Sequence, residues 1–289
     1  MDKIAVFIKT CEGRPSVLWV LNSITFGLQG TNYRIYISDE EPLNDWKKHL
    51  YEELQREGHH IELHKKGMNV GVAKNQLLDC LNDEDFVLRM DDDFELGGEF
   101  RISALKTVLK SSKEIGFCAD FERQVGKGRN INSGSLRPAG GYYIVAPPKL
   151  IKKFHSPFKK RRVVSGIRYS LAEHTRNLLL IKRDVFEKVR WNEQLKFMGE
   201  HSDFLMSIRE AGYSGAYTPD SVHYHREDLA LYRDAYTRNS AEATKRPGEE
   251  EMRNVYQERW SCDRIVTKYP VSWYILEAGR RLMAKWARD

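Results

Sequence analysis

The sequence of 289 residues has no long apolar run and no paired cysteine motif. Its first apolar stretch, Ile4 to Ile8, is too short for the core of a signal peptide or for a membrane span. The cysteines have no CxxC spacing, which is typical of free thiols in a reducing compartment. We therefore expect a cytoplasmic protein. The four cysteines are Cys11, Cys80, Cys118 and Cys262.

Acidic residues are missing from residues 147–170, a stretch with eight lysines and arginines. The whole chain has a formal net charge of +6 and an isoelectric point of about 9.0, which favours anionic partners. This stretch is equally compatible with a solvated surface loop and with a docking surface for phosphate-bearing lipid, anionic glycan or nucleic acid. The sequence does not separate these alternatives.

Short β-type runs alternate with helical stretches over the first 120 residues. This alternation predicts βα units on a largely parallel sheet. Glycines punctuate residues 126–141, which indicates a mobile loop that can act as a lid. Strands are expected at residues 4–8, 33–37, 60–63, 86–90, 116–119, 142–145 and 177–181, and helices from Pro15 and at 45–55, 72–81 and 204–211.

Three consecutive aspartates, Asp91, Asp92 and Asp93, follow directly after the apolar run from Phe86 to Met90. Mg²⁺ and Mn²⁺ bind oxygen ligands, usually one or two carboxylates with phosphate oxygens and water. A nucleotide diphosphate would occupy the cation's free coordination positions, and the cation would stabilise the diphosphate as a leaving group. For an isolated run of this kind, a solvated acidic turn is the alternative.

Other polar residues follow neighbouring strands or open a helix beside them. In an open α/β sheet, ligands bind beyond the carboxyl ends of the strands, and a helix start can sit close to phosphate. Taken singly, each residue has an ordinary alternative role, such as a turn, a helix cap or a surface lysine. These candidates for donor binding are Thr10, Glu12, Arg14, Asp39, Lys74 and Asn75.

In their order along the chain, these segments resemble the GT-A glycosyltransferases, particularly the family 2 inverting enzymes, which use nucleotide-sugar donors. The resemblance spans residues 4–226. It implies that Asp39 and Lys74 contact the nucleotide, that Asp91 lies on the ribose or sugar side, and that Asp93 binds the metal. The segments that carry it are residues 4–10 with Arg14-Pro15, Ile37-Ser38-Asp39, Gly71 to Asn75, and Met90 to Asp93.

A second group of chemical residues is Glu200, His201 and Asp203. Sugar transfer needs a base for the acceptor hydroxyl, and a carboxylate at a helix start can serve. Asp203 is the first candidate and Glu200 the second, although Asp203 could instead cap the helix and Glu200 could pair with a nearby cation. Many relatives carry Glu-Asp here. The Glu-His pair resembles the GalNAc-transferring branch, and His201 could accept a proton or orient the carboxylates.

Two histidines, His223 and His225, fall on the same side of an extended segment because alternate strand residues point the same way. GT-A enzymes often complete the metal shell with a histidine after the catalytic acid. His223 resembles that ligand best and His225 is close behind, while a structural histidine is the alternative. Arg226 is a candidate for binding the diphosphate.

The expected fold is α/β, GT-A and Rossmann-like, with a mixed, mostly parallel central sheet flanked by helices. Residues 1–235 form the catalytic domain, with a nucleotide-binding half (1–120) and an acceptor and catalytic half (121–235). Residues 236–289 form a helical C-terminal extension, which ends in a helix after Pro270 with one apolar stripe. This helix would pack on the catalytic domain, lie peripherally on an anionic membrane, or bind the acceptor.

The sequence predicts a metal-dependent inverting glycosyltransferase that uses Mn²⁺ or Mg²⁺ and moves a hexose or N-acetylhexosamine from a UDP-sugar to a hydroxyl. The acceptor would be a glycan, a lipid-linked molecule or another hydroxyl compound. One alternative is a sugar-nucleotide pyrophosphorylase, whose glycine-rich basic loop is missing near the N-terminus. Another is a non-catalytic basic module that binds nucleic acid or membrane. Sugar, acceptor and oligomeric state stay open.

Overall fold

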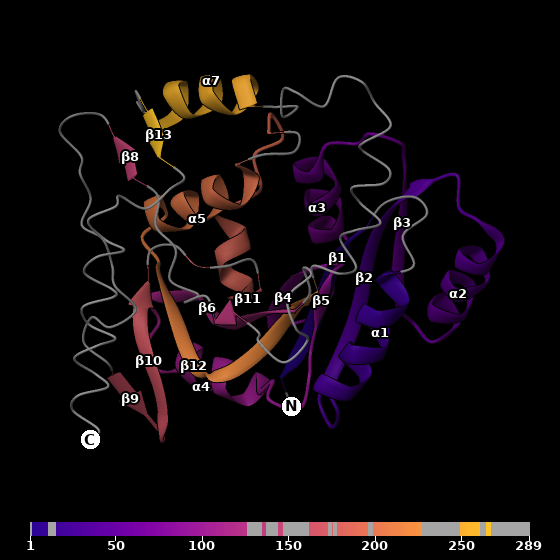
Figure 1. Ribbon diagram of the computed structural model, residues 1–289, viewed down its shortest axis with the longest axis horizontal. Coiled ribbons are helices and arrows are strands. Elements are labelled where there is room, and N and C mark those ends of the chain that lie inside the picture. The colour runs from indigo at the N-terminus through magenta and orange to yellow at the C-terminus, as the bar shows by residue number, and fades with distance from the viewer. Residues whose placement is uncertain are drawn as a thin grey trace.

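A central sheet with helices on both faces forms the body of the protein in the computed structural model (Figure 1). Several predicted features lie outside the described residues: Glu12, Arg14, the helix start at Pro15, most of residues 126–161 and the helix after Pro270. The described residues are 2–10, 16–125, 135–136, 144–146, 162–172, 175, 178–195, 199–226, 249–260 and 264–266.

The first four long strands are parallel and lie in the order β3-β2-β1-β4. Their apolar runs are buried because helices cover both faces of the sheet. Their carboxyl ends therefore meet along one rim, and helices of the expected kind connect them. The elements are β1 (Lys3–Lys9), α1 (Ser16–Gly27), β2 (Asn32–Glu41), α2 (Asp45–Arg56), β3 (His60–Lys65), α3 (Val70–Asp79) and β4 (Phe86–Asp91).

The second half of the sheet is mixed. The short strand β11 (Leu179–Lys182) runs antiparallel between β4 and β6 (Ile115–Val125), and β6 pairs in parallel with β12 (Ser214–Arg226). The predicted mixed α/β fold with flanking helices is confirmed. The remaining strands are β5 (Phe94–Glu95), β7 (Ser135–Leu136), β9 (Arg162–Val164), β10 (Ile167–Ala172), and the separate pair β8 (Ile144–Ala146) and β13 (Arg264–Val266).

Two hydrophobic cores fill the two faces of the sheet. The first lies under α1, α2 and α4 (Ile102–Lys110) and takes alternate residues of β1 such as Ile4 and Val6. The second lies under α3 and α5 (Glu200–Glu210) and includes Phe7, Phe204 and residues of the 3-10 helix η1 (Arg183–Glu187). Alternation along β1 thus assigns neighbouring residues to opposite cores.

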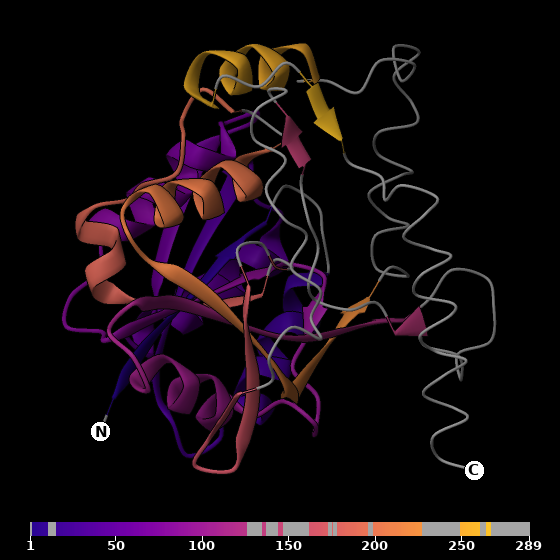
Figure 2. The ribbon, with the colours of Figure 1, turned by 90° about the vertical axis from the view of Figure 1, so that its left-hand side faces the viewer.

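A third, smaller core attaches helix α7 (Glu249–Trp260) to the outside of α5. Both ribbon views show α7 lying over α5 (Figure 2). Met252 and Tyr256 of α7 pack there with Leu195, which precedes α5. Among the described residues, no helix is long and apolar enough to cross a membrane.

Part of the basic stretch, for which a loop was the default expectation, is a hairpin instead. Strands β9 and β10 pair antiparallel. Ser165 and Gly166 join them with φ angles of 47° and 79°. Two positive φ values suit the right-handed twist of the flanking strands, which explains the tight turn.

Candidate active site

The end of β4 and the start of α5 lie close together at the rim. Arg89 of β4 is buried, and its Nη2 donates a hydrogen bond of 2.8 Å to Oδ1 of Asp91. The same nitrogen lies 3.6 Å from Oε1 of Glu200. Lys74 of α3 donates to that Glu200 oxygen at 2.9 Å. Two buried cations therefore hold a carboxylate of α5 beside the aspartates that end β4.

The charge state of Glu200 follows from these neighbours. Burial favours its neutral form, but Lys74 and Arg89 outweigh burial and lower the pKa of Glu200 to about 2. Burial and then Arg89 lower the pKa of Lys74. Near neutral pH, Glu200 is thus an ionised carboxylate between two positive groups.

His201 points toward another part of the chain. Its Nε2 donates to the carbonyl oxygen of Thr175 at 2.9 Å. Burial, followed by the charge of Arg89, lowers the pKa of His201 to about 4. The imidazole is therefore neutral near pH 7.

Asp203 faces α7 rather than the aspartates. Its fully buried carboxylate accepts hydrogen bonds from Arg259 Nη1 at 2.8 Å and Trp260 Nε1 at 2.7 Å. Burial raises the pKa of Asp203, and the contacts from Trp260 and Arg259 oppose that rise. Of the two predicted base candidates, the structure brings Glu200 to the end of β4 and uses Asp203 to attach α7.

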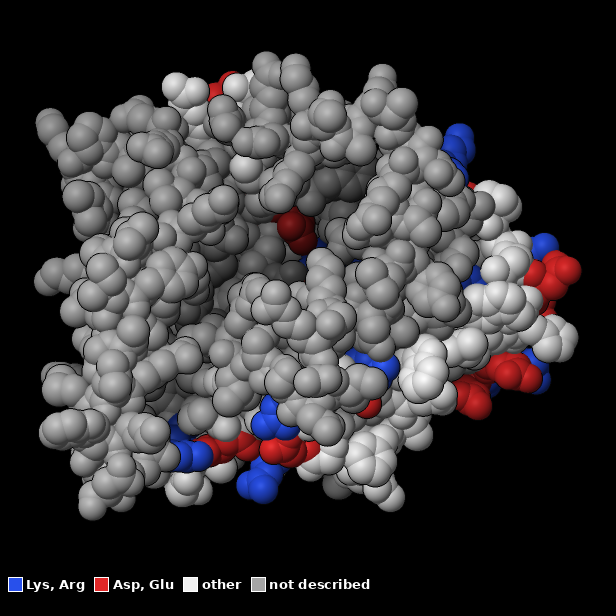
Figure 3. Space-filling view, in the orientation of Figure 1, with Lys and Arg blue, Asp and Glu red and all other residues white. Residues whose placement is uncertain are grey.

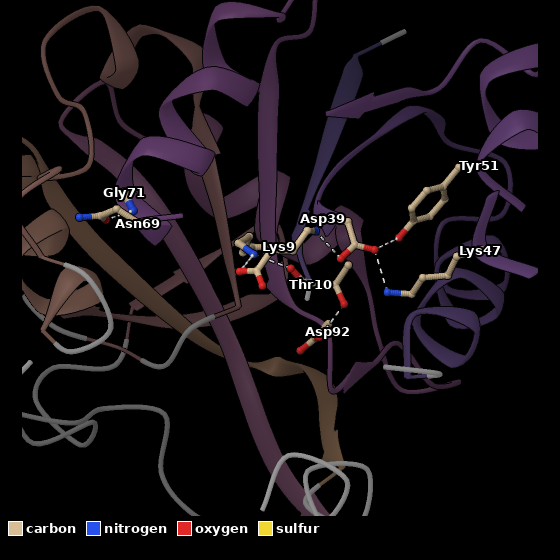
Figure 4. Close-up of polar contacts among 9 residues, drawn as sticks. Lys9, Thr10, Asp39, Lys47, Tyr51, Asn69, Gly71 and Asp92 are labelled. Atoms are coloured by element: carbon tan, nitrogen blue, oxygen red, sulfur yellow. Dashed lines mark hydrogen bonds and ion pairs between the residues drawn. The ribbon is translucent and has the colours of Figure 1, made fainter. Parts of the chain in front are cut away.

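The middle aspartate ties two strand ends together (Figure 4). Thr10, which follows β1, donates from Oγ1 to Oδ2 of Asp92 at 2.8 Å, and both side chains are buried. The backbone N–H of Thr10 also bonds to the carbonyl of Ser38 at 2.9 Å. Thr10 and Asp92 thus fix the rim next to Asp91.

Asp39 is fully buried at the end of β2. Its Oδ2 accepts bonds from Lys47 Nζ at 2.7 Å and Tyr51 OH at 2.6 Å, and its Oδ1 accepts one from the backbone of Glu40 at 2.7 Å (Figure 4). Lys47 and Tyr51 both lie on α2. The carboxylate therefore anchors α2 to the sheet beside the rim.

Asn75 and Gly71 hold α3 against the turn that leads to α5. The Asn75 side chain accepts a bond from the N–H of Trp191 at 3.0 Å and donates to the carbonyl of Trp191 and to Glu193. A Cβ at Gly71 would lie 2.5 Å from the carbonyl oxygen of Asn192. These contacts place α3, and Lys74 with it, next to Glu200.

The two histidines of β12 have different surroundings. His225 Nε2 lies 3.3 Å from Oδ2 of Asp93, and its Nδ1 lies 3.6 Å from Oε1 of Glu122 on β6. Burial alone would lower the pKa of His225, but the contacts with Asp93 and Glu122 raise it to about 10. His223 is fully buried and shares a 2.6 Å hydrogen bond with Asp120.

Asp93 and His225 are potential ligands for a divalent cation. The strongly raised pKa of His225 shows that its neighbours favour positive charge at this place. Carboxylate oxygen and imidazole nitrogen are both acceptable ligands for Mn²⁺. Glu122 lies 3.6 Å from the other ring nitrogen, where a metal-binding histidine commonly has its outer partner.

The remaining predicted residue, Arg226, lies beside this group. Its Nη1 donates to Glu95 at 2.7 Å, its guanidinium lies over the ring of Trp19 at 5.8 Å, and its N–H bonds to the carbonyl of Asp93. Figure 3 shows acidic and basic atoms near the middle of the face seen in Figure 1.

Three contributing residues were missed in the sequence: Arg89, Asp120 and Glu122. Arg89 has a signal, because an arginine inside a strand that is otherwise apolar must find an acidic partner. The acidic pair alternates along β6 beyond Ala119, where the predicted strand ended. A longer strand would have placed both acids on one face.

No family model and no curated protein matches the sequence. Among solved structures, the chain is similar to GalNAc-T7 crystallised with UDP, GalNAc and Mn²⁺, with a TM-score of 0.56 and 15% identity over 98% of this chain and 58% of that chain. The chain thus spans under two thirds of that protein's length.

Two structures of S. aureus TarS show a weaker likeness, each with 14% identity over 90% of this chain. The structure of TarS residues 1–349 has a TM-score of 0.48 and is covered over 72% of its length, and a longer one has 0.49 and 44%. At such identities a likeness shows the fold alone. The fold of this chain is that of the GT-A glycosyltransferases.

Proposed function

We propose that this protein is a metal-dependent glycosyltransferase that moves a sugar from a nucleoside-diphosphate donor, UDP-linked, to an acceptor hydroxyl with inversion at the anomeric carbon. The observation that carries the proposal is the meeting of Asp91, Glu200, Lys74 and Arg89 at the rim, next to Asp93 and His225. UDP and Mn²⁺ in the GalNAc-T7 structure support the same donor chemistry.

Asp93 and Nε2 of His225 would hold Mn²⁺ or Mg²⁺, and Glu122 would orient the His225 ring from behind. When bound, the cation neutralises charge on the diphosphate and so makes it a better leaving group. His223 stays the second candidate for an imidazole ligand, since Asp120 binds its Nδ1 and its Nε2 has no hydrogen-bond partner among the described residues.

Glu200 acts as the base. Its carboxylate takes the proton of the acceptor hydroxyl while the hydroxyl oxygen bonds to the anomeric carbon and the bond from that carbon to the diphosphate breaks. A pKa of about 2 makes Glu200 a weak base in the free protein. The negative charge of a bound donor would offset the positive charges of Lys74 and Arg89. The pKa of Glu200 would then rise, and Glu200 would become a stronger base during the reaction.

The nucleotide lies at the rim formed by Thr10, Asp39 and Lys74, with Asp91 toward the ribose or sugar. Thr10 and Asp92 fix the strand ends, and Asp39 fixes α2. Arg226 would meet the diphosphate, while Glu12 and Arg14, which lie outside the described residues, stay candidates for donor binding. A hexose or an N-acetylhexosamine is the transferred group, and the acceptor is a glycan or a lipid-linked molecule.

Release of UDP from a panel of UDP-sugars, with Mn²⁺ and the purified protein, tests the proposal. We expect slow hydrolysis of at least one donor, which Asp93→Ala abolishes. The matched control is Asp83→Ala, since Asp83 is an exposed aspartate that pairs with Lys3 away from the rim. A panel in which no donor is bound or cleaved would overturn the proposal.

A further inference from the structure

A second group of potential metal ligands lies at the outer edge of the parallel strands, separated from β4 by β1 and β2. His60 and Glu62 are on β3, the outer strand of the sheet. Residues i and i+2 of a strand share a face, so both side chains point to the same side. Cys80 follows the last residue of α3, which returns over the sheet to the amino end of β3. The topology thus brings a thiol to a carboxylate and an imidazole.

The three potential ligand atoms are close together. One nitrogen of His60, one oxygen of Glu62 and the sulfur of Cys80 all lie within 4.8 Å of one another. His60 Nε2 is 3.3 Å from Glu62 Oε2. The ring of Tyr36 lies 5.6 Å from that of His60, which restricts the imidazole. All three residues are partly exposed, so an ion and a water molecule can reach them.

We propose that His60, Glu62 and Cys80 form a Zn²⁺ site, with water at the fourth position. A thiolate with an imidazole and a carboxylate suits zinc, a borderline-soft ion, better than Mg²⁺ or Ca²⁺. The ligand distances of zinc, about 2.0–2.3 Å, need only a small approach of the three groups. The ion would attach the carboxyl end of α3 to the edge of the sheet.

The charge around the thiol agrees with a cation. Burial, followed by Glu62 and Asp79, raises the pKa of Cys80, because an added negative charge is unfavourable beside these carboxylates. Zinc would supply the missing positive charge, and its binding would release the thiol proton. The proposal does not depend on the glycosyltransferase activity.

Titration of the chelator-treated full chain with Co²⁺ tests the site, since a thiolate bound to Co²⁺ absorbs in the near ultraviolet. We expect one equivalent of Co²⁺ to produce this absorption and Zn²⁺ to displace it. Cys80→Ser should abolish it, and His60→Gln and Glu62→Gln should weaken Co²⁺ binding about tenfold or more. Zn²⁺ should raise the Tm of the unaltered protein and not that of Cys80→Ser.

Matched controls separate this site from other thiols and from the rim. Cys118→Ala alters a buried thiol on β6, and His49→Gln alters an exposed histidine on α2. Both should keep the absorption, and so should Asp93→Asn. Absence of the absorption in the unaltered protein, or its full retention in a folded Cys80→Ser protein, would overturn the proposal. Circular dichroism establishes that each variant is folded.

Discussion

At the residue scale, two carboxylates three positions apart on α5 have different surroundings. Glu200 contacts Lys74 and lies near Arg89, whereas Asp203 is enclosed by Arg259 and Trp260. We predict that Glu200→Gln lowers kcat by about 10²- to 10⁴-fold because it removes a proton acceptor. It should also lower Tm, because Lys74 and Arg89 lose their anionic partner. Steady-state rates of UDP release with an acceptor measure this effect.

Asp203→Asn is the matched comparison. It should also lower Tm, because its contacts attach α7, but it should affect kcat less than Glu200→Gln does. A larger loss of kcat in folded Asp203→Asn than in Glu200→Gln would return the base assignment to Asp203.

His225 predicts a pH dependence of stability in the metal-free protein. Its folded pKa, about 10, lies above the ordinary value of 6.5. The stabilisation by protonated His225 is therefore complete below about pH 6.5 and is lost as the pH rises toward 10. Urea unfolding in chelator should show this fall, and His225→Gln should flatten it. Equal slopes in both proteins would contradict the prediction.

The sequence shows which residues of the rim are suited to bind a ligand, but it does not show which of them contact one another. Asp91 to Asp93 and Glu200 stand out because acids follow apolar runs or open a helix. The choice between Glu200 and Asp203 depends on Arg259, more than 50 residues away, and no local pattern carries that contact. Burial of an acid against a distant cation is decided by tertiary packing.

At the element scale, the close approach of α3 to the turn before α5 requires glycine. A helical glycine changed to alanine usually gains up to about 1 kcal/mol. At Gly71 a Cβ would lie 2.5 Å from the Asn192 carbonyl oxygen. We predict that Gly71→Ala lowers the free energy of unfolding by about 1–3 kcal/mol, since a backbone atom must move. It should also lower kcat by displacing Lys74.

Gly98→Ala is the control for this change, because its nearest contact is Phe26 at 4.0 Å. Urea unfolding and kinetics of both variants give the comparison. A Gly71→Ala protein as stable and active as Gly98→Ala would show that α3 and the turn can separate without consequence.

Helix α7 supplies a second prediction at this scale. Arg259→Ala leaves the buried Asp203 carboxylate without its cation, although Trp260 still donates to it. We expect a loss of about 1–3 kcal/mol in the free energy of unfolding. Glu258→Ala, an exposed change on α7, should have little effect. If Asp203→Asn and Arg259→Ala combine additively in a double-mutant cycle, the contact does not stabilise the protein.

The elements with strong apolar patterns were predictable and the short ones were not. Strands β1 to β4 are continuous apolar runs or alternations bounded by polar turns, and all four were predicted. Helix α4 was missed although Ile102, Leu105 and Val108 have helical spacing. Strands β9 and β10 are short and contain arginines among apolar residues, and pairing across the Ser165-Gly166 turn makes them a hairpin.

At the scale of the whole molecule, the rim lies between the two halves of the sheet. The parallel strands supply Thr10, Asp39 and the aspartates, and the mixed half supplies Glu122 and His225. A donor at this rim would contact both halves. The alternation of strands and helices along the chain predicted the parallel half of the sheet. The antiparallel insertion of β11 between β4 and β6 is a long-range pairing that periodicity does not reveal.

This arrangement predicts linked binding of cation and nucleotide. Asp93 and His225 are too few ligands to complete the shell of Mn²⁺, and diphosphate oxygens would supply further ones. Mn²⁺ with UDP should therefore raise Tm more than the sum of the shifts produced by each alone, where one ligand at 100 times its Kd raises Tm by about 5–10 °C. Thermal unfolding with Mn²⁺, UDP and both measures this. Asp93→Asn should remove the excess shift and leave that of UDP alone, whereas additive shifts in the unaltered protein would place the nucleotide away from the cation.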